Sequence, residues 1–282
     1  MSDPSPPISL PYFDALLSSL QAQDPQVEQA FGRHVHWGYW ENPWSAQNTA
    51  ADFGAAAERL SQAVYGAAQV AQGERILDVG CGFGGTIASL NENFQPMDLT
   101  GLNIDPRQLE RARQKVQPQG ENKINFVEGN ACALPFEDAS FDRVLAVECI
   151  FHFPDRRQFF QEAFRVLKPG GRLALSDFVP LDLLVPLVQW NLQVNPPGFY
   201  GPTHSKFTLG DYRHLAETTG FKLDLEQNIT WNTLPTYWYL WDLGRSLQPT
   251  DPSAWSQTAT IALVSHLGLL QYLILGFQKP MA

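Results

Sequence analysis

Short apolar runs alternate with amphipathic segments between residues 74 and 180 of this chain. The apolar runs are rich in Val, Ile, Leu and Phe and are bounded by Gly, Asn and Asp, as is typical of buried strands. The segments between them place apolar residues three and four positions apart, which predicts helices. This alternation predicts a parallel sheet covered by helices on both faces. The expected strands are 74–79, 98–104, 123–129, 141–148 and 172–179, and the expected helices are 86–94, 106–115 and 155–167.

The pattern changes on both sides of this region. The chain begins with an irregular stretch and then becomes rich in alanine, which predicts one helix. Proline, glycine and aromatic residues, among them Trp190, Phe199 and Tyr200, predict an insertion over the carboxyl edge of the sheet. The expected elements outside the central region are a helix over 52–69, the insertion over 181–205, a helix over 207–220, a strand over 221–230, helical aromatic-rich residues 231–265 and a last strand over 269–280.

The composition narrows the class of protein and of partner. Of the 282 residues 44% are hydrophobic and 17% are charged, which is enough apolar material for a continuous core. The net charge of −10 argues against nucleic acid or an anionic membrane as the main partner. Residues 261–277 are too polar for a membrane span, and the N-terminal residues lack a secretory pattern. Three widely spaced cysteines show no zinc spacing, so we expect no metal and a reducing cytoplasm.

A glycine-rich loop follows the first predicted strand and precedes a helix. Gly80, Gly82 and Gly85 satisfy the pattern GxGxxG, and glycine is needed where the backbone approaches a ligand closely. A nicotinamide enzyme would seat a pyrophosphate there. The carboxylate of Asp78, directly before the loop, would repel a pyrophosphate and would suit a cationic amino group instead.

Three motifs resemble the class I S-adenosylmethionine-dependent methyltransferases over roughly residues 70–180. They are ILDVGCGFGG (76–85), GNACALPFEDASFDRVLA (129–146) and RVLKPGGRLALSDF (165–178). Together with HVHWGYW (34–40), they are most similar to the branch that contains natural-product sugar O-methyltransferases, tocopherol methyltransferases and glycine/sarcosine-type N-methyltransferases. The resemblance implies a doubly wound, mainly parallel seven-stranded α/β sheet of the Rossmann-like methyltransferase fold, with a helical, aromatic-rich cap.

The resemblance also implies a division of the chain and a cofactor. We expect an N-terminal helical or lid segment over 1–70, a cofactor-binding α/β core over 71–180, and cap insertions with the last strands over 181–282. The cofactor is S-adenosyl-L-methionine, with S-adenosylhomocysteine as product. The residues implied in binding it are Trp37, Asp78, Gly80, Gly82, Gly84, Asn103, Ile104, Asn130, Ala131, Cys132 and Glu148.

Two of these residues depart from the family pattern. Asn103 stands where the family has an acid that holds the ribose hydroxyls, and Asp105 either replaces that acid or caps the helix that follows. Asn130 stands where the family has Asp, and an amide retains the capacity to hydrogen-bond adenine. The backbone N–H groups of Ala131 and Cys132 are expected at the adenine, and Leu102 and Ile104 either sandwich it or belong to the core.

Two residues after the fourth strand are candidates for chemistry. His152 is the candidate general base, because an unperturbed imidazole titrates near neutral pH; the alternative is that it only packs. Glu148 is expected to shape the cofactor site rather than to move a proton.

The predicted reaction is methyl transfer to a small acceptor of apolar or aromatic character, with O-methylation favoured over N- or C-methylation. A dehydrogenase and an inactive cofactor-binding protein remain as alternatives. Residues 31–44 are expected to form a lid that the cofactor orders, with a permanent brace as the alternative. The oligomeric state stays open.

Overall fold

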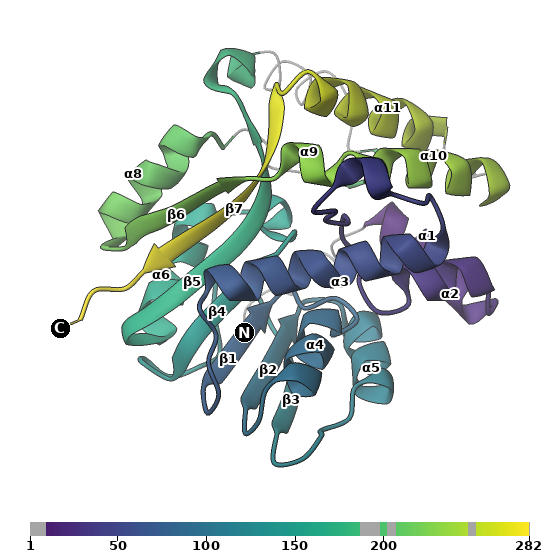
Figure 1. The fold of residues 1–282 in the computed structure, drawn as a ribbon. Coiled ribbons are helices and arrows are strands. Elements are labelled where there is room, and N and C mark those ends of the chain that lie inside the picture. Colours follow the sequence, from purple (N-terminus) through teal and green to yellow (C-terminus); the bar gives the residue numbers. More distant parts are fainter. Residues whose placement is uncertain (1–9, 187–197, 202–206, 248–251, 282) are drawn as a thin grey trace, which may run out of the picture.

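The computed structural model describes residues 10–186, 198–201, 207–247 and 252–281, and a single seven-stranded sheet forms its centre (Figure 1). The strand order is β3-β2-β1-β4-β5-β7-β6. All neighbours are parallel except β7, which runs antiparallel to β5 and β6. The predicted seven-stranded, mainly parallel α/β fold is therefore confirmed. The strands are β1 (Arg75–Val79), β2 (Asp98–Asn103), β3 (Lys123–Glu128), β4 (Phe141–Val147), β5 (Leu167–Pro180), β6 (Lys222–Asn228) and β7 (Leu270–Gln278).

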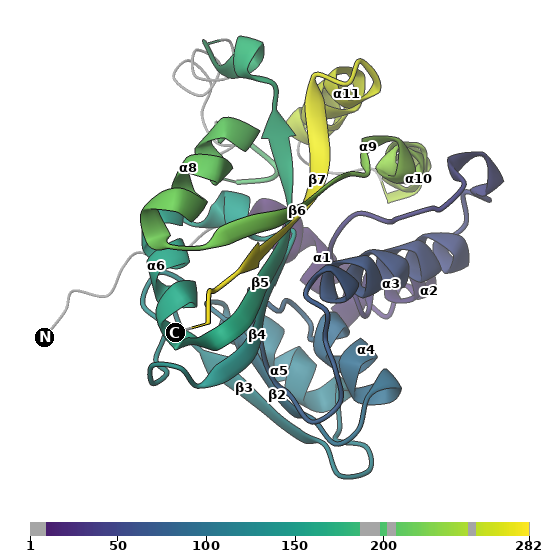
Figure 2. The same cartoon turned by 60° about the vertical axis from the view of Figure 1, so that its left-hand side comes forward.

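Helices cover both faces of this sheet (Figure 2). On one face lie α3, α4 and α5, and on the other lie α6 and α8. Alternate residues of the same strand feed the two cores: Ile76 packs with the α3 and α4 side chains, and Leu77 packs with those of α6. The helices are α1 (Pro11–Gln21), α2 (Pro25–Phe31), α3 (Ala50–Ala67), α4 (Gly85–Asn93), α5 (Pro106–Lys115), α6 (Arg156–Val166), α8 (Leu209–Thr219), α9 (Thr230–Thr233), α10 (Pro235–Leu247) and α11 (Pro252–His266), with 3-10 turns at η1 (Pro43–Ser45), η2 (Ile150–His152) and η3 (Asp182–Leu184).

The sequence prediction was wrong about the beginning of the chain. Residues expected to be irregular form α1 and α2. Each helix has a proline in its first turn, where the missing N–H costs nothing. In addition, the Asp24 carboxylate caps α2 by accepting from the backbone N–H groups of Gln26 and Val27. Proline there begins a helix rather than interrupting one.

Two further boundaries differ from the prediction. The helix expected to reach Leu167 ends at Val166, and β5 begins at Leu167 instead of at residue 172. Leu167 pairs with Phe141 of β4, so the KPGG segment belongs to the strand, with a register irregularity beside it. The aromatic-rich region after β6 divides into α9, α10 and α11.

A third apolar cluster joins the N-terminal helices to the cap. Phe13 of α1, Phe31 of α2, Phe53 of α3 and Tyr239 of α10 pack together with Phe83 of the glycine loop. The N-terminal segment and α10 therefore meet over the loop at the carboxyl end of β1. Trp190 and His204, with most of the predicted insertion, lie outside the described residues. In the described ranges no helix is both long and apolar enough to cross a membrane.

Candidate functional site

The glycine loop is held by hydrogen bonds to β2, and Gly82 is an uncrowded position in it. The N–H groups of Gly80 and Cys81 both donate to the carbonyl oxygen of Leu102, at 2.7 and 3.0 Å. A Cβ at Gly80 would lie 2.7 Å from the Cβ of Cys149, so only glycine fits there. At Gly82, where φ is +55°, the nearest atom to an added Cβ would be 3.9 Å away. The loop therefore presents bare backbone to open space at Gly82.

Asp78 carries a buried carboxyl group that lacks a full set of partners. The residue is 1% exposed, and its Oδ2 atom has no hydrogen-bond partner among the described residues. Burial raises the pKa of Asp78 to about 8. Because a buried, unpaired carboxylate is costly, a cationic group that reached it would gain a strong charge-assisted contact. The amino group of S-adenosylmethionine meets that requirement, and a pyrophosphate does not.

The end of β2 places Asn103 and Ile104 differently. The Asn103 side chain is buried; its amide donates to Gln108 Oε1 at 3.0 Å, and its oxygen accepts from the N–H of Asp105 at 3.1 Å. Ile104 is 44% exposed, which leaves its side chain available to a flat ring. Asp105 accepts from the N–H of Arg107 and caps α5, so the capping alternative is present. A ribose contact by Asp105 stays a prediction.

The segment after β3 forms a turn at Asn130. The Asn130 side chain folds back and accepts from the N–H of Cys132 at 2.8 Å, as short polar side chains do in turns. The expected contact of that N–H with adenine would have to replace this bond, and it stays a prediction. The thiol of Cys132 donates to the Asp155 carbonyl oxygen, and Ala131 is buried in the core beside it. Adenine contacts by Asn130 and Ala131 stay predictions.

Glu148 organises the end of β4. Its φ of +49° is uncommon for a residue with a side chain, and its N–H donates to Ser176 Oγ at 3.0 Å. Its carboxylate accepts from the backbone N–H of Trp37 at 3.0 Å and from the Tyr272 hydroxyl. Burial raises the pKa of Glu148 to about 8. These contacts support the expectation that Glu148 shapes the site.

His152 lies in the 3-10 turn after Glu148, and its Nε2 atom is 3.0 Å from the hydroxyl of Tyr12. The Tyr12 and His152 rings are stacked at 5.9 Å between centroids. Sequence reasoning missed Tyr12, which belongs to α1 and lies 140 residues earlier in the chain. No local signal points to this contact, although an N-terminal helix could have been inferred from Pro11.

Aromatic rings from several segments meet beside Glu148 and His152. The Trp37 indole packs edge-on against Phe178 and Tyr237, and it lies 6.2 Å from the ring of Tyr200. Tyr200 in turn contacts Tyr12. Of the predicted cluster 236–241, Tyr237 joins these rings, whereas Trp238 and Trp241 are about half exposed.

Segment 34–40 is hydrogen-bonded along its backbone. The N–H groups of Trp37, Gly38, Tyr39 and Trp40 donate to Glu148, to Thr236 Oγ1, and to the carbonyl oxygens of Ala56 and Asn232, respectively. These bonds tie the segment to the end of β4 and to α3, α9 and α10, and they favour the brace over the lid. His34 and His36 are buried inside this segment rather than presented to the site. Within the described ranges, no group of three or more His, Cys, Asp or Glu side chains could hold a metal ion.

The predicted residues converge at one edge of the sheet. Asp78, Asn103 and Glu148 lie at or just beyond the carboxyl ends of β1, β2 and β4, which are neighbours. The strand order reverses between β1 and β4, which is where open α/β sheets bind their ligands.

Known proteins resemble this chain in sequence and in fold. The methyltransferase domain family matches residues 77–175. Methyltransferase GfsG of Streptomyces halstedii is 41% identical over 150 residues, covering 53% of this chain and 52% of its own length. The 2-methyl-6-phytyl-1,4-hydroquinone methyltransferase of a Synechocystis strain is 31% identical over 262 residues, covering 91% of this chain and 75% of its own length. The chain thus spans about half the length of the first curated relatives it matches.

Solved structures share the whole architecture. The [4+2]-cyclase SpnF has a TM-score of 0.72 at 20% identity, over 98% of both chains. The geranyl diphosphate C-methyltransferase of Streptomyces coelicolor has a TM-score of 0.71 at 15% identity, over 97% of this chain and 100% of its own. At such identities these likenesses establish the fold alone. The match over nine tenths of the chain to the Synechocystis enzyme carries the assignment further: the chain belongs to the S-adenosylmethionine-dependent methyltransferases.

Proposed function

We propose that this protein transfers the methyl group of S-adenosylmethionine to an oxygen atom of a small, apolar or aromatic acceptor. The observation that carries the proposal is the buried carboxyl oxygen of Asp78, which has no partner among the described residues and comes just before the uncrowded Gly82 of the glycine loop. S-adenosylmethionine supplies an electrophilic methyl group on a sulfonium centre. Asp78 would bind its amino group, Gly82 would lie beneath its methionine part, and Ile104 would pack against its adenine.

Alignment and the exclusion of water are the main contributions of the protein to such a reaction. Positioning alone can lower the activation barrier by on the order of 7–11 kcal/mol. Glu148 holds the Trp37 peptide against the end of β4, and the aromatic rings around Trp37 and Tyr200 form an apolar wall there. An oxygen nucleophile must also lose a proton. His152 is the group we propose to accept it, with Tyr12 bonded to its Nε2 atom.

The class of acceptor is inferred from the aromatic wall and from the relatives. Erythromycin 3''-O-methyltransferase of Saccharopolyspora erythraea and O-methyltransferase cnsE of Penicillium expansum are 35% identical over 55% and 70% of this chain, respectively. Their names favour oxygen as the nucleophile. We therefore propose a secondary metabolite with a hydroxyl group.

One observation favours a second candidate. The relative that covers 91% of this chain is named for a phytyl hydroquinone. Such an acceptor is aromatic and apolar, as the rings beside His152 require, and it offers ring carbons as well as oxygens. Methylation of a ring carbon is therefore the alternative, and N-methylation of a small amine ranks below it.

Product analysis distinguishes these candidates. The enzyme is incubated with methyl-labelled S-adenosylmethionine and a panel of phenols, prenylated hydroquinones, macrolides and small amines, and the labelled atom is located by NMR. A methyl ether supports the proposal, a ring-methylated product supports the second candidate, and binding of S-adenosylhomocysteine without any turnover supports the inactive cofactor-binding protein.

Three features inferred from the sequence remain part of the proposal. They are the division into a segment over 1–70, a core over 71–180 and a cap over 181–282, the exclusion of nucleic acid by the net charge of −10, and a cytoplasmic location. The three cysteines are free, which agrees with a reducing compartment.

A further inference from the structure

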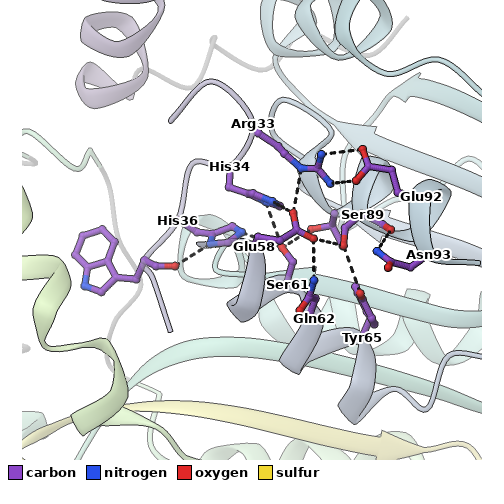
Figure 3. Close-up of polar contacts among 12 residues, drawn as sticks. Arg33, His34, His36, Glu58, Ser61, Gln62, Tyr65, Ser89, Glu92 and Asn93 are labelled. Carbon is purple, nitrogen blue, oxygen red and sulfur yellow. Dashed lines mark hydrogen bonds and ion pairs between the residues drawn. The ribbon is translucent and has the colours of Figure 1, made fainter. Parts of the chain in front are cut away.

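Two buried histidines connect the segment that contains Trp37 to helices α3 and α4 (Figure 3). His34 and His36 are 4% and 7% exposed, respectively, and neither has a part in the proposed methyl transfer. Their side chains point into a polar cluster between the helices, where Figure 3 shows them beside Glu58 and Ser61. A buried cluster of polar side chains holds the helices and segments around it in one arrangement when its hydrogen bonds are all formed.

The hydrogen bonds of His36 fix the ring in one tautomer. Its Nδ1 atom lies 2.9 Å from the carbonyl oxygen of Trp37, and a carbonyl only accepts, so Nδ1 carries the proton. Burial lowers the pKa of His36 to about 3, so the ring is neutral and Nε2 accepts. The Ser61 hydroxyl lies 3.1 Å from this Nε2 atom and 3.3 Å from Nδ1 of His34, and the shorter contact makes it the donor to His36. Both ring nitrogens are therefore bonded, one to the Trp37 peptide and one to α3.

Ser61 carries this connection on to the glycine loop. Its Oγ atom lies 3.1 Å from Oγ1 of Thr86, the second residue of α4. Because α4 begins directly after the loop, a movement of the loop reaches Ser61 through Thr86. The path from the loop to the Trp37 carbonyl thus contains three intermediate side chains, Thr86, Ser61 and His36.

The same tryptophan reaches the opposite side of the site through its N–H group, which donates to Glu148 Oε2 at 3.0 Å. The Tyr272 hydroxyl donates to the same oxygen and lies 3.2 Å from Ser176 Oγ, which accepts from the Glu148 N–H. Two sets of hydrogen bonds, joined through the backbone of Trp37, therefore connect α4, after β1, with the end of β4.

A second contact holds the segment against α3. His34 Nε2 lies 2.8 Å from Oε2 of Glu58, and Arg33 forms ion pairs with Glu58 and Glu92. Burial alone would raise the pKa of Glu58, but hydrogen bonds from His34 and Ser89 outweigh it and lower the value to about 2. The carboxylate therefore stays charged and keeps His34, two residues before His36, in place.

We propose that His36 is a positioning residue of the methyl-transfer site: it holds the Trp37–Gly38 peptide, next to the peptide whose N–H bonds Glu148, and it links the backbone at Trp37 to the helix after the glycine loop. The inference rests on the proposed function, because only methyl transfer makes the residues around Glu148 an active site. The hydrogen bonds of His36 do not depend on that function. We propose no contact between His36 and the cofactor or the acceptor. His36 acts only through its hydrogen bonds to Trp37 and Ser61.

Amide hydrogen exchange in the full chain without cofactor tests the positioning directly. In His36→Phe, the N–H groups of Trp37 and Gly38 should exchange about fivefold to tenfold faster, because the Trp37–Gly38 peptide loses a hydrogen bond and the peptide before it is held less firmly. Core amides such as that of Leu77 should keep their wild-type rates. Ser61→Ala should give a smaller increase at the same two amides. Gln62→Leu is the matched control, because it removes a bond to Glu58 in the same cluster without touching the path.

A second readout separates positioning from simple destabilisation. The Trp37 N–H lowers the pKa of Glu148 by donating to its carboxylate, so loosening the peptide should move the Glu148 titration to higher pH. The carboxyl band is followed by infrared spectroscopy in the absence of cofactor and is assigned with Glu148→Gln. His36→Phe should show the shift. His36→Asn, whose amide can donate to the Trp37 carbonyl, should restore the wild-type titration.

Wild-type exchange at Trp37 and Gly38 in both His36→Phe and Ser61→Ala would overturn the inference. An unchanged Glu148 titration in His36→Phe would overturn it equally. Both measurements use the protein without cofactor, so a failure of the wild type to bind S-adenosylhomocysteine would contradict the proposed function alone.

Discussion

The hydroxyl of Tyr12, in the first described helix, lies 3.0 Å from Nε2 of His152. The N-terminal helix thereby reaches the residue proposed to accept a proton. Burial raises the pKa of Tyr12 well above its ordinary value, and the nearby carboxylate of Glu148 adds to that effect. The phenol is therefore neutral at physiological pH, and it donates to the imidazole when Nε2 carries no proton. Tyr12 thus orients His152, with the phenol as donor or as acceptor according to the tautomer of the imidazole.

Replacing Tyr12 tests this orientation. In Tyr12→Phe we expect kcat to fall about threefold to tenfold, which is the effect of losing one hydrogen bond. The affinity for S-adenosylhomocysteine should stay within about twofold of wild type. Tyr65→Phe, which loses a buried phenol contact to Ser89 far from His152, is the control. An undiminished kcat in Tyr12→Phe would show that His152 needs no orientation by the phenol.

The pKa of Asp78 predicts a dependence of folding stability on pH. A carboxyl group whose folded pKa is raised to about 8 contributes stability that is fully present below its unfolded pKa of 3.8 and is lost as the pH rises through about 8. Glu148 adds a contribution of the same sign. Urea denaturation without cofactor should therefore show declining stability between about pH 4 and pH 8, and Asp78→Asn should flatten this decline. An equally steep decline in the variant would argue against the raised pKa.

Cofactor binding should show the opposite trend with pH. A cationic amino group favours the ionised form of Asp78, so affinity for S-adenosylhomocysteine should increase from pH 6.5 towards pH 8, with release of a proton. Calorimetry in buffers of different ionisation enthalpy measures that release. Asp78→Asn should lose about tenfold to a hundredfold in affinity, as expected for a hydrogen bond to a charged group. Affinity within about twofold of wild type would remove Asp78 from the binding site.

The hydrogen bonds of segment 34–40 predict how it responds to the cofactor. Four successive backbone N–H groups, from Trp37 to Trp40, donate to other parts of the protein. We therefore expect slow and equal proteolytic cleavage between residues 30 and 45 with and without S-adenosylhomocysteine. Clear protection by the ligand would instead restore the lid that the sequence suggested.

A buried ion pair between α6 and β5 predicts that its removal lowers folding stability without lowering the affinity for S-adenosylhomocysteine. Arg156 and Asp177 are fully buried and joined to each other and to Tyr212. Arg156→Met should lower the free energy of unfolding by about 3–5 kcal/mol, because Asp177 is left as an uncompensated buried charge. Urea denaturation measures this loss. Arg213→Met, which removes an exposed pair with Glu226, should leave the stability unchanged.

Parts of the molecule whose signal is local could be predicted from the sequence. Apolar runs located the strands, and the glycines after Asp78 located the glycine loop, because backbone conformation and burial depend on residues that are neighbours in the sequence. The resemblance of three motifs supplied the number of strands, seven. Asp78, Asn103 and Glu148 were placed correctly at the ends of neighbouring strands, because parallel strands end at one edge.

Contacts between distant segments could not be predicted in this way. The Tyr12–His152 and Trp37–Glu148 pairs are 140 and 111 residues apart, and only tertiary packing determines them. The turn that diverts the Cys132 N–H depends on the rotamer of Asn130, which no pattern encodes. His34 and His36 were expected only as part of the lid segment 31–44, and nothing in the sequence indicates that they bind Glu58 and Ser61.

The central claim is that the edge of the sheet near Asp78 binds S-adenosylmethionine, and a thermal shift comparison tests it most directly. A ligand that binds the native state raises the melting temperature, whereas one that does not bind leaves it unchanged. With saturating S-adenosylhomocysteine we predict a clear increase for the wild type, a much smaller one for Asp78→Asn, and no change with NADH. A clear increase with NADH and none with S-adenosylhomocysteine would contradict the account.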